Sequence, residues 1–303
     1  MTNTKKNLSI HDYTCPESIK GLCERLDFPQ EAEERILFHA ENMDFEPFEP
    51  HLPGLFSLET GPKAVEEIPR LCISDDDPTG DTGFKALTVY LAAALHTHEI
   101  YREFGIPDDI YYDSMEAFCL FVKEHKVSYG CYGFDRHFWI YRQLSAKIFR
   151  LGTLEFEITT LPGNAPQVGP ASGGSPVLSV HIPSDAVLTR EELDKSYKMA
   201  VEFFAKYFPD YSYDCIYCST WLLSPVLKKI LKPGSRILEF QSDYEITHVD
   251  YESNSGIRWI YKREYDDYTQ LPEDTSLMRG MKRILLEGGK TGNGTGYLKD
   301  FSG

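Results

Sequence analysis

Two side chains suited to proton transfer lie on predicted strands in the second half of the chain. His181 comes near the end of the run VLSVHI, on the strand face that also carries Ser179. A neutral histidine at a strand end is a suitable general base near neutral pH, but an edge histidine with one structural hydrogen bond is more common. Glu157 lies on the polar face of FRLGTLEFEI (149–158), opposite the face of Phe156. Both interpretations of His181 stay open.

A second group of candidate residues ends the next predicted strand, at about 213–219. Ser219, Thr220 and Trp221 stand at the strand end where open α/β sheets place their ligands. The indole of Trp221 is equally suited to the wall of a ligand pocket and to the hydrophobic core. The sequence therefore favours a site near these residues without fixing the role of Trp221.

Three motifs resemble known metal-binding or phosphate-binding sites, but each lacks part of the required pattern. Cys215 and Cys218 have C-x-x-C spacing, but residues three apart on a strand face opposite sides and no second ligand pair is spaced for zinc. The segment DDDPTGDTGFKA (75–86) resembles a calcium loop, yet Ala86 stands where a bidentate glutamate is needed. The Gly-Lys-Thr at 289–291 lacks the preceding glycine of a phosphate-binding loop. We expect no metal.

Charge, hydropathy and cysteine usage disfavour several classes of protein. The 303 residues carry a formal charge of −16, which disfavours binding to nucleic acids and anionic membranes. No apolar run is long enough to span a bilayer, and the N-terminal segment lacks the apolar core of a secretory signal. The seven cysteines are odd in number and scattered, as in a protein with reduced thiols. These features predict a cytoplasmic protein.

The first half of the chain is predicted to be all-helical. From Pro16 to about Ile148 the apolar spacing is repeatedly that of helices, and prolines stand at or near the expected first turns. These prolines are Pro16, Pro29, Pro62 and Pro107. We expect a helical domain over residues 1–145.

After Ile148 the apolar period changes to that of strands. Helices are predicted at about 190–208, from Ser224 and at about 275–287, and strands at 149–158, 177–182, 213–219, 236–240, YEITHVDY and GIRWIYK. The Pro- and Gly-rich segment 161–176 is predicted to be a long exposed loop and is a candidate lid, and GGKTGNGTG (288–296) is predicted to be a flexible tail. The fold class is α/β (α+β), with a mixed-sheet domain over residues 146–303.

Several segments of the second half resemble a GNAT-fold acyltransferase. They are FRLGTLEFE (149–157), PVLSVHIP (176–183), EFFAKYFPDY (202–211), CSTWLLSP (218–225), SRILEFQ (235–241) and the segment 275–298. The chain is similar to the bacterial family that pairs a GNAT-like C-terminal domain with a helical N-acyltransferase N-terminal domain. The resemblance covers about residues 146–298 well and the helical half more loosely.

The resemblance implies transfer of an acyl group from acyl-CoA to an amine, on a small molecule or a peptide. His181 or Glu157 would then deprotonate the amine, and Ser219 would protonate the leaving thiolate. Leu188, Thr189 and Arg190 would bind acyl-CoA, and Trp221 and Gln241 the substrate.

One loop departs from the family pattern. The family binds pyrophosphate with a glycine-rich loop, whereas PSDAVLTRE (183–191) contains no glycine. Thr189 and Glu192 are spaced as a capping box, which would use the helix N–H groups that a phosphate needs. A non-catalytic ligand-binding or interaction protein on a degenerate GNAT fold is therefore the alternative.

Overall fold

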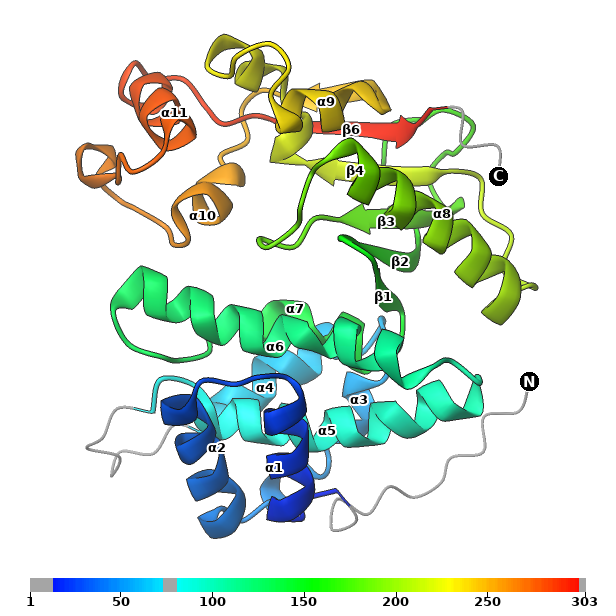
Figure 1. Cartoon of the computed structure of the whole chain (residues 1–303), viewed down its shortest axis with the longest axis vertical. Helices are drawn as coiled ribbons and strands as arrows, with labels where there is room; N and C mark the ends of the chain where they lie inside the picture. Colours follow the sequence, from blue (N-terminus) through cyan, green and yellow to red (C-terminus); the bar gives the residue numbers. More distant parts are fainter. Residues whose placement is uncertain (1–12, 73–80, 300–303) are drawn as a thin grey trace. The chain divides into compact units, whose positions relative to one another are not determined.

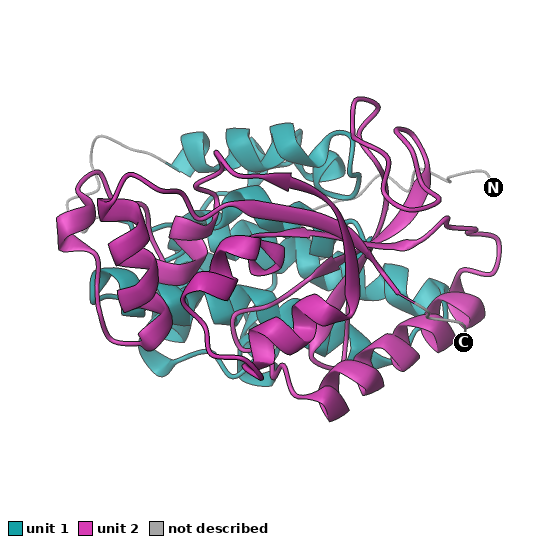
Figure 2. Cartoon of the chain, turned by 90° about the horizontal axis from the view of Figure 1, so that it is seen from above, with its two compact units in different colours: residues 1–149 teal, residues 150–303 magenta. Residues whose placement is uncertain are grey.

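The computed structural model describes residues 13–72 and 81–299. The chain divides into two compact units, residues 1–149 and 150–303, which Figure 2 distinguishes by colour. No helix in the described ranges is long and apolar enough to cross a membrane.

The first unit is built from helices, as predicted (Figure 1). They are α1 (Pro16–Arg25), α2 (Gln30–Asn42), α3 (Leu52–Leu55), α4 (Gly61–Cys72), α5 (Phe84–Glu103), α6 (Asp108–Tyr129) and α7 (His137–Leu144), with the 3-10 turn η2 (Glu46–Phe48). The predicted proline positions are confirmed: Pro16 begins α1, Pro62 is the second residue of α4, and Pro29 and Pro107 immediately precede α2 and α6. Fixed φ and a missing N–H suit these positions.

Helix α5 forms the buried centre of this unit. Most of its residues are buried, from Phe84 to Tyr101. Its first turn is capped by Asp81, whose Oδ1 accepts a hydrogen bond of 2.8 Å from the backbone N–H of Phe84. Residues 75–80 of the calcium-like segment 75–86 lie outside the described residues, but Asp81 is a helix cap.

The second unit contains a six-stranded mixed sheet in the order β1-β2-β3-β4-β6-β5, which confirms the predicted α/β class. The strands are β1 (Ile148–Leu151), β2 (Leu154–Thr160), β3 (Pro176–His181), β4 (Ile216–Thr220), β5 (Tyr244–Asp250) and β6 (Asn293–Leu298). Strands β3 and β4 are parallel, while β2 with β3, β4 with β6, and β6 with β5 are antiparallel.

One face of the sheet packs on helix α8 (Arg190–Tyr207), whose predicted position is confirmed. The Tyr197 hydroxyl of α8 is 3.4 Å from that of Tyr244 on β5, which shares this face with Cys218. Burial raises the pKa of both tyrosines, so both remain neutral at physiological pH. The register places Glu157 of β2, Ser179 of β3 and Tyr217 of β4 on the opposite face.

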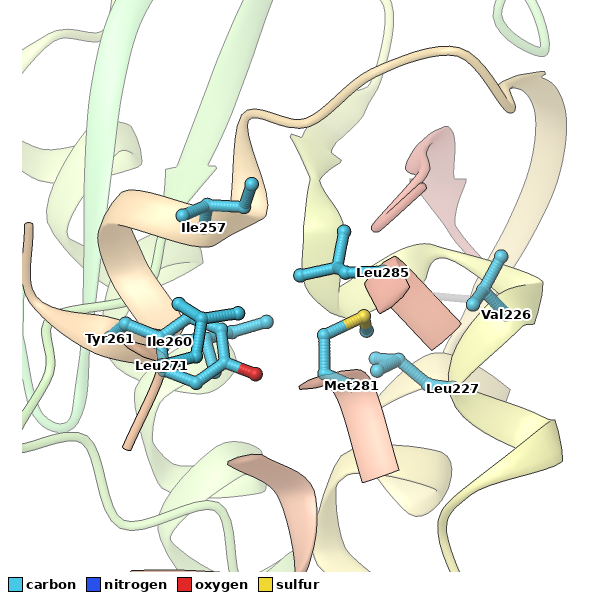
Figure 3. Close-up of a cluster of buried hydrophobic side chains, with 8 residues drawn as sticks. All are labelled: Val226, Leu227, Ile257, Ile260, Tyr261, Leu271, Met281 and Leu285. Carbon is cyan, nitrogen blue, oxygen red and sulfur yellow. The ribbon is translucent and has the colours of Figure 1, made fainter. Parts of the chain in front are cut away.

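Short helices follow β4 and separate β5 from β6 (Figure 1). They are η3 (Trp221–Leu223), η4 (Pro225–Lys229), α9 (Arg236–Ser242), α10 (Gly256–Tyr261), η5 (Tyr268–Gln270) and α11 (Ser276–Leu286). Residues of η4, α10 and α11, together with Leu271, enclose a buried apolar cluster that includes Leu227, Ile260 and Met281 (Figure 3).

Two predicted strands of this region are helices instead. Residues 236–240 belong to α9 and GIRWIYK contains α10. In α10 the buried Ile257, Ile260 and Tyr261 follow i, i+3, i+4 spacing, which places them on one helical face. Short apolar runs fit either structure, and here the helical period was the correct one.

The predicted flexible tail 288–296 is also wrong in its second half. Residues Asn293–Leu298 form β6, which pairs with both β4 and β5. Its glycines permit close backbone approach: a Cβ on Gly294 would lie 2.4 Å from the carbonyl oxygen of Leu223, and one on Gly296 2.4 Å from that of Glu245. Glycine here serves packing rather than flexibility.

The loop 161–176 is attached to the sheet by apolar contacts that its composition did not reveal. Leu161, Val168 and Ala171 are buried in a cluster with Val177 and Cys215. Val168 and Ala171 also exchange backbone hydrogen bonds of 2.9 and 3.0 Å. The expectation of an exposed loop is therefore wrong for these residues.

Candidate active site

The second unit presents a strip of polar side chains on the sheet face opposite α8. Strand register places these residues on one face, because paired residues share a face and alternate residues return to it. They are Glu155, Glu157, Ser179, His181, Tyr217, Ser219, Glu245, Asn293, Thr295 and Tyr297. The face contains all three residues predicted to transfer protons.

Glu157 and His181 are in direct contact on this face. His181 Nε2 lies 2.7 Å from Glu157 Oε2, and the Glu157 side chain is only 9% exposed. Because a carboxylate only accepts hydrogen bonds, the bonding hydrogen is on Nε2, and the lone pair of a neutral imidazole is then on Nδ1. The pair has the arrangement of a histidine base oriented by a carboxylate.

Strands β3 and β4 stop pairing with each other next to Glu157 and His181. Their ladder consists of Leu178 with Ile216 and Ser179 with Tyr217, although both strands continue. We call the segments beyond these pairs, 180–181 and 218–220, the β3–β4 fork. There the Val180 carbonyl accepts a hydrogen bond of 3.5 Å from the buried thiol of Cys218. His181 and Ser219 are the residues of the polar face that follow the last pair on each strand.

Ser219 is hydrogen-bonded to side chains of β6. Its Oγ is 2.9 Å from Thr295 Oγ1 and accepts a hydrogen bond of 3.0 Å from Asn293 Nδ2. Ser219 is exposed, while Thr295 and Asn293 are half-buried. Sequence reasoning missed Asn293 and Thr295, although the alternation of Asn293, Thr295 and Tyr297 with glycine and leucine is the period of a strand.

The N-terminus of α8 does not contain the predicted capping box. Thr189 is the N-cap residue, but among the described residues its side chain makes no capping hydrogen bond with the first turn. Arg190, the first helical residue, contacts Asp243 Oδ1 at 2.5 Å and Asp194 Oδ1 at 2.7 Å. A guanidinium has five N–H donors, more than these two contacts use.

Other contacts hold the glycine-free loop before α8. Arg150 donates hydrogen bonds of 3.1 and 3.0 Å to the two carboxylate oxygens of Asp185. The N–H of Val187 donates to Thr153 Oγ1 at 2.6 Å, and Leu188 is half-buried two residues before α8. The loop is fixed by side chains from the β1–β2 region.

Trp221 and Gln241, the two predicted substrate-binding residues, contact other parts of the second unit. Trp221 begins η3 and packs against the apolar cluster of η4, α10 and α11, which supports its core interpretation. Gln241 is buried on α9, and its Nε2 donates to the carbonyls of Leu222 and Ser224 at 2.8 and 2.9 Å. Gln241 also lines a cavity of about 380 Å³ beside Tyr244 and Lys299.

The C-x-x-C thiols make separate contacts. Cys218 bonds to Val180, whereas Cys215 contacts the carbonyl of Val168 at 3.8 Å. Within residues 13–72 and 81–299, no group of three or more His, Cys, Asp or Glu side chains is arranged to hold a metal ion.

Comparison with solved structures gives the same fold over nearly the whole chain. An acyltransferase in complex with decanoyl-CoA and teicoplanin is 22% identical, with 93% of this chain and 88% of that chain covered and a TM-score of 0.76. An acyltransferase mutant in complex with octanoyl-CoA has the same identity and coverage and a TM-score of 0.73. An acyltransferase in complex with CoA and 10C-teicoplanin is 23% identical, with the same coverage and a TM-score of 0.72.

Family models match both units. The model of the N-acyltransferase N-terminal domain matches residues 17–146, and that of the GNAT-like C-terminal domain matches residues 148–298. No curated protein matches the chain. The chain belongs to the GNAT-like N-acyltransferases, the family that joins these two domains.

Proposed function

We propose that this N-acyltransferase catalyses acyl transfer from acyl-CoA to an amine at the β3–β4 fork, with His181 as the base. The observation that carries the proposal is the 2.7 Å contact between His181 Nε2 and the buried Glu157. It orients the imidazole and provides a negative partner for the imidazolium that forms during proton transfer.

The reaction needs two proton transfers. The amine nitrogen attacks the thioester carbonyl carbon, and His181 Nδ1 takes a proton from that nitrogen. The C–S bond then breaks, the thiolate takes the proton of Ser219 Oγ, and an amide and free CoA result. Ser219 regains a proton, and His181 loses one, through solvent. Each group therefore returns to its starting state.

For acyl-CoA binding we propose the start of α8. The amide groups of a helix N-terminus favour anions, and the Thr189 side chain does not cap those of α8. Arg190 provides a cation in this first turn, and Leu188 and Thr189 provide the preceding backbone. These features support pyrophosphate binding without a glycine-rich loop, although Glu191 and Glu192 place negative charge in the same turn. For the acceptor we propose an amine on a small molecule or a peptide.

The direct test combines the purified chain with a panel of acyl-CoAs and amines. We expect thiol release and an amide of the expected mass, and a fall in kcat of about 100- to 10,000-fold in His181→Ala. Absence of thiol release with every pair would overturn the proposal. If acyl-CoA binding persisted without turnover, the result would favour the non-catalytic alternative.

A thermal melt tests the binding site separately. At 100 times its dissociation constant, acyl-CoA stabilises the protein by about 2.7 kcal/mol. We expect Arg190→Gln to weaken acyl-CoA binding about tenfold, the equivalent of about 1.4 kcal/mol. Lys198→Gln is the matched control, because Lys198 is an exposed cation farther along α8 that pairs with Glu202. Equal affinity of the two variants would contradict the assignment of Arg190.

A further inference from the structure

Asn293 contacts the proposed acid but has no part in the two proton transfers above. We propose that Asn293 is a positioning residue, which holds the Ser219 hydroxyl in the orientation that delivers its proton to the leaving thiolate. This inference rests on the proposed function and assigns a role to the strand predicted to be a flexible tail.

The direction of the hydrogen bond carries the inference. An amide nitrogen only donates, so Ser219 Oγ accepts from Asn293 Nδ2 at 3.0 Å and its own hydrogen points elsewhere. Thr295 Oγ1 lies 2.9 Å from the same oxygen. As Ser219 gives up its proton, charge develops on Oγ, and a donor already in place stabilises that charge without reorganisation.

The backbone beneath Asn293 is closely packed. The antiparallel register pairs Ser219 with Thr295 and Thr220 with Gly294, so Asn293 is the next residue of β6 on the same face. On one side, a Cβ on Gly292 would lie 2.4 Å from Ser224 Oγ; on the other, one on Gly294 would lie 2.4 Å from Leu223 O. Such packing holds Asn293 in register with Ser219.

Asn293→Asp separates positioning from simple strand cohesion. Aspartate keeps the shape of asparagine and can accept a hydrogen bond from Ser219, so cohesion between β4 and β6 survives. It cannot donate to Oγ and places a negative charge beside it. We therefore expect kcat with acyl-CoA to fall at least about tenfold in both Asn293→Asp and Asn293→Ala, with KM for both substrates little changed.

The leaving group provides a second readout. Aryl thiolates leave without protonation, so Asn293→Ala and Ser219→Ala should have little effect on transfer from an S-acyl thiophenol. Both should slow transfer from an S-acyl N-acetylcysteamine. The double variant should be no slower than Ser219→Ala alone, because the two residues act as a unit. Tyr297→Phe is the control, since it removes a different side-chain hydrogen bond, to Glu245, from the same strand and face.

The outcomes distinguish this inference from the proposed function. If the wild-type chain transfers acyl groups and Asn293→Asp matches its kcat, the positioning role is wrong while the base assignment stands. Additive losses in the double variant, or equal losses with both leaving groups, would also overturn it. A wild-type chain without any acyl transfer would overturn both proposals together. Thermal melts of each variant confirm that folded proteins are compared.

Discussion

Glu157 and His181 meet diagonally across two antiparallel strands. The register pairs Glu157 with Ser179 and His181 with Glu155, yet the bonded atoms are His181 Nε2 and Glu157 Oε2, 2.7 Å apart. Diagonal neighbours on a sheet face are within reach of long side chains. Glu157 therefore provides the contact that orients the imidazole.

Replacing Glu157 with glutamine tests this arrangement. A glutamine amide can donate to Nε2 instead of accepting from it, which would stabilise the tautomer with its lone pair on the wrong nitrogen. We expect kcat of Glu157→Gln to fall at least about tenfold, with a smaller change in KM. Steady-state kinetics with one acyl-CoA and one amine measure this split. Glu245→Gln is the control, because Glu245 lies on the same face but bonds to Tyr297; equal kcat in the two variants would contradict the role of Glu157.

The missing cap of α8 gives a second prediction, on stability. A threonine whose side chain caps a helix contributes about 1 kcal/mol, as we expect for Thr275, which accepts a hydrogen bond of 3.1 Å from Met278 N. Thr189 makes no such bond, so Thr189→Ala should change the free energy of unfolding by less than about 0.5 kcal/mol. Denaturant unfolding of Thr189→Ala and Thr275→Ala measures the two changes in the free energy of unfolding. A loss of about 1 kcal/mol for Thr189→Ala would show that Thr189 caps α8 after all.

Short-range sequence patterns predicted the helices of the first unit and strand β2. Prolines at helix starts and apolar spacing located the helices of the first unit, and the alternation in LEFEI located β2. Helix α9 was missed because RILEF is too short for its period to distinguish a strand from a helix.

The sequence predicted the proton-transfer residues of the candidate site but not the residues that contact Ser219 from β6. His181, Glu157 and Ser219 stand on strands whose apolar pattern is visible in the sequence. Thr295 and Asn293 reach Ser219 from 76 and 74 positions away, through a strand rich in glycine. Glycine weakens the strand pattern, while the packing that requires it exists only in the folded sheet.

Thiol accessibility gives a third prediction. Cys15 and Cys131 are exposed, and the other five cysteines are buried. Burial raises the pKa of Cys23 and Cys72 to about 12 and that of Cys215 to about 11, so these thiols are protonated as well as shielded at pH 8. A disulfide reagent should therefore titrate two thiols rapidly in the native protein and seven after denaturation.

The control is a variant with Cys15→Ser and Cys131→Ser, which should show no fast-reacting thiol before denaturation. A third fast thiol in the wild-type protein, retained in this variant, would show that a buried cysteine becomes accessible.

The fourth prediction concerns Gly294, which connects the packing of β6 to the chemistry of the fork. A Cβ at this position would lie 2.4 Å from the carbonyl oxygen of Leu223, and backbone cannot move aside as a flexible side chain can. Gly294→Ala should therefore cost about 1–3 kcal/mol of stability. It should also lower kcat, because Gly294 lies between Asn293 and Thr295, which both contact Ser219.

Gly163→Ala is the matched control for Gly294→Ala. Nothing lies within 4 Å of the Cβ position of Gly163, so the change should be neutral or should stabilise the protein by up to about 1 kcal/mol. Denaturant unfolding and steady-state kinetics on the same preparations measure both effects, and a Gly294→Ala variant with wild-type stability and kcat would show that β6 does not hold Ser219 in place.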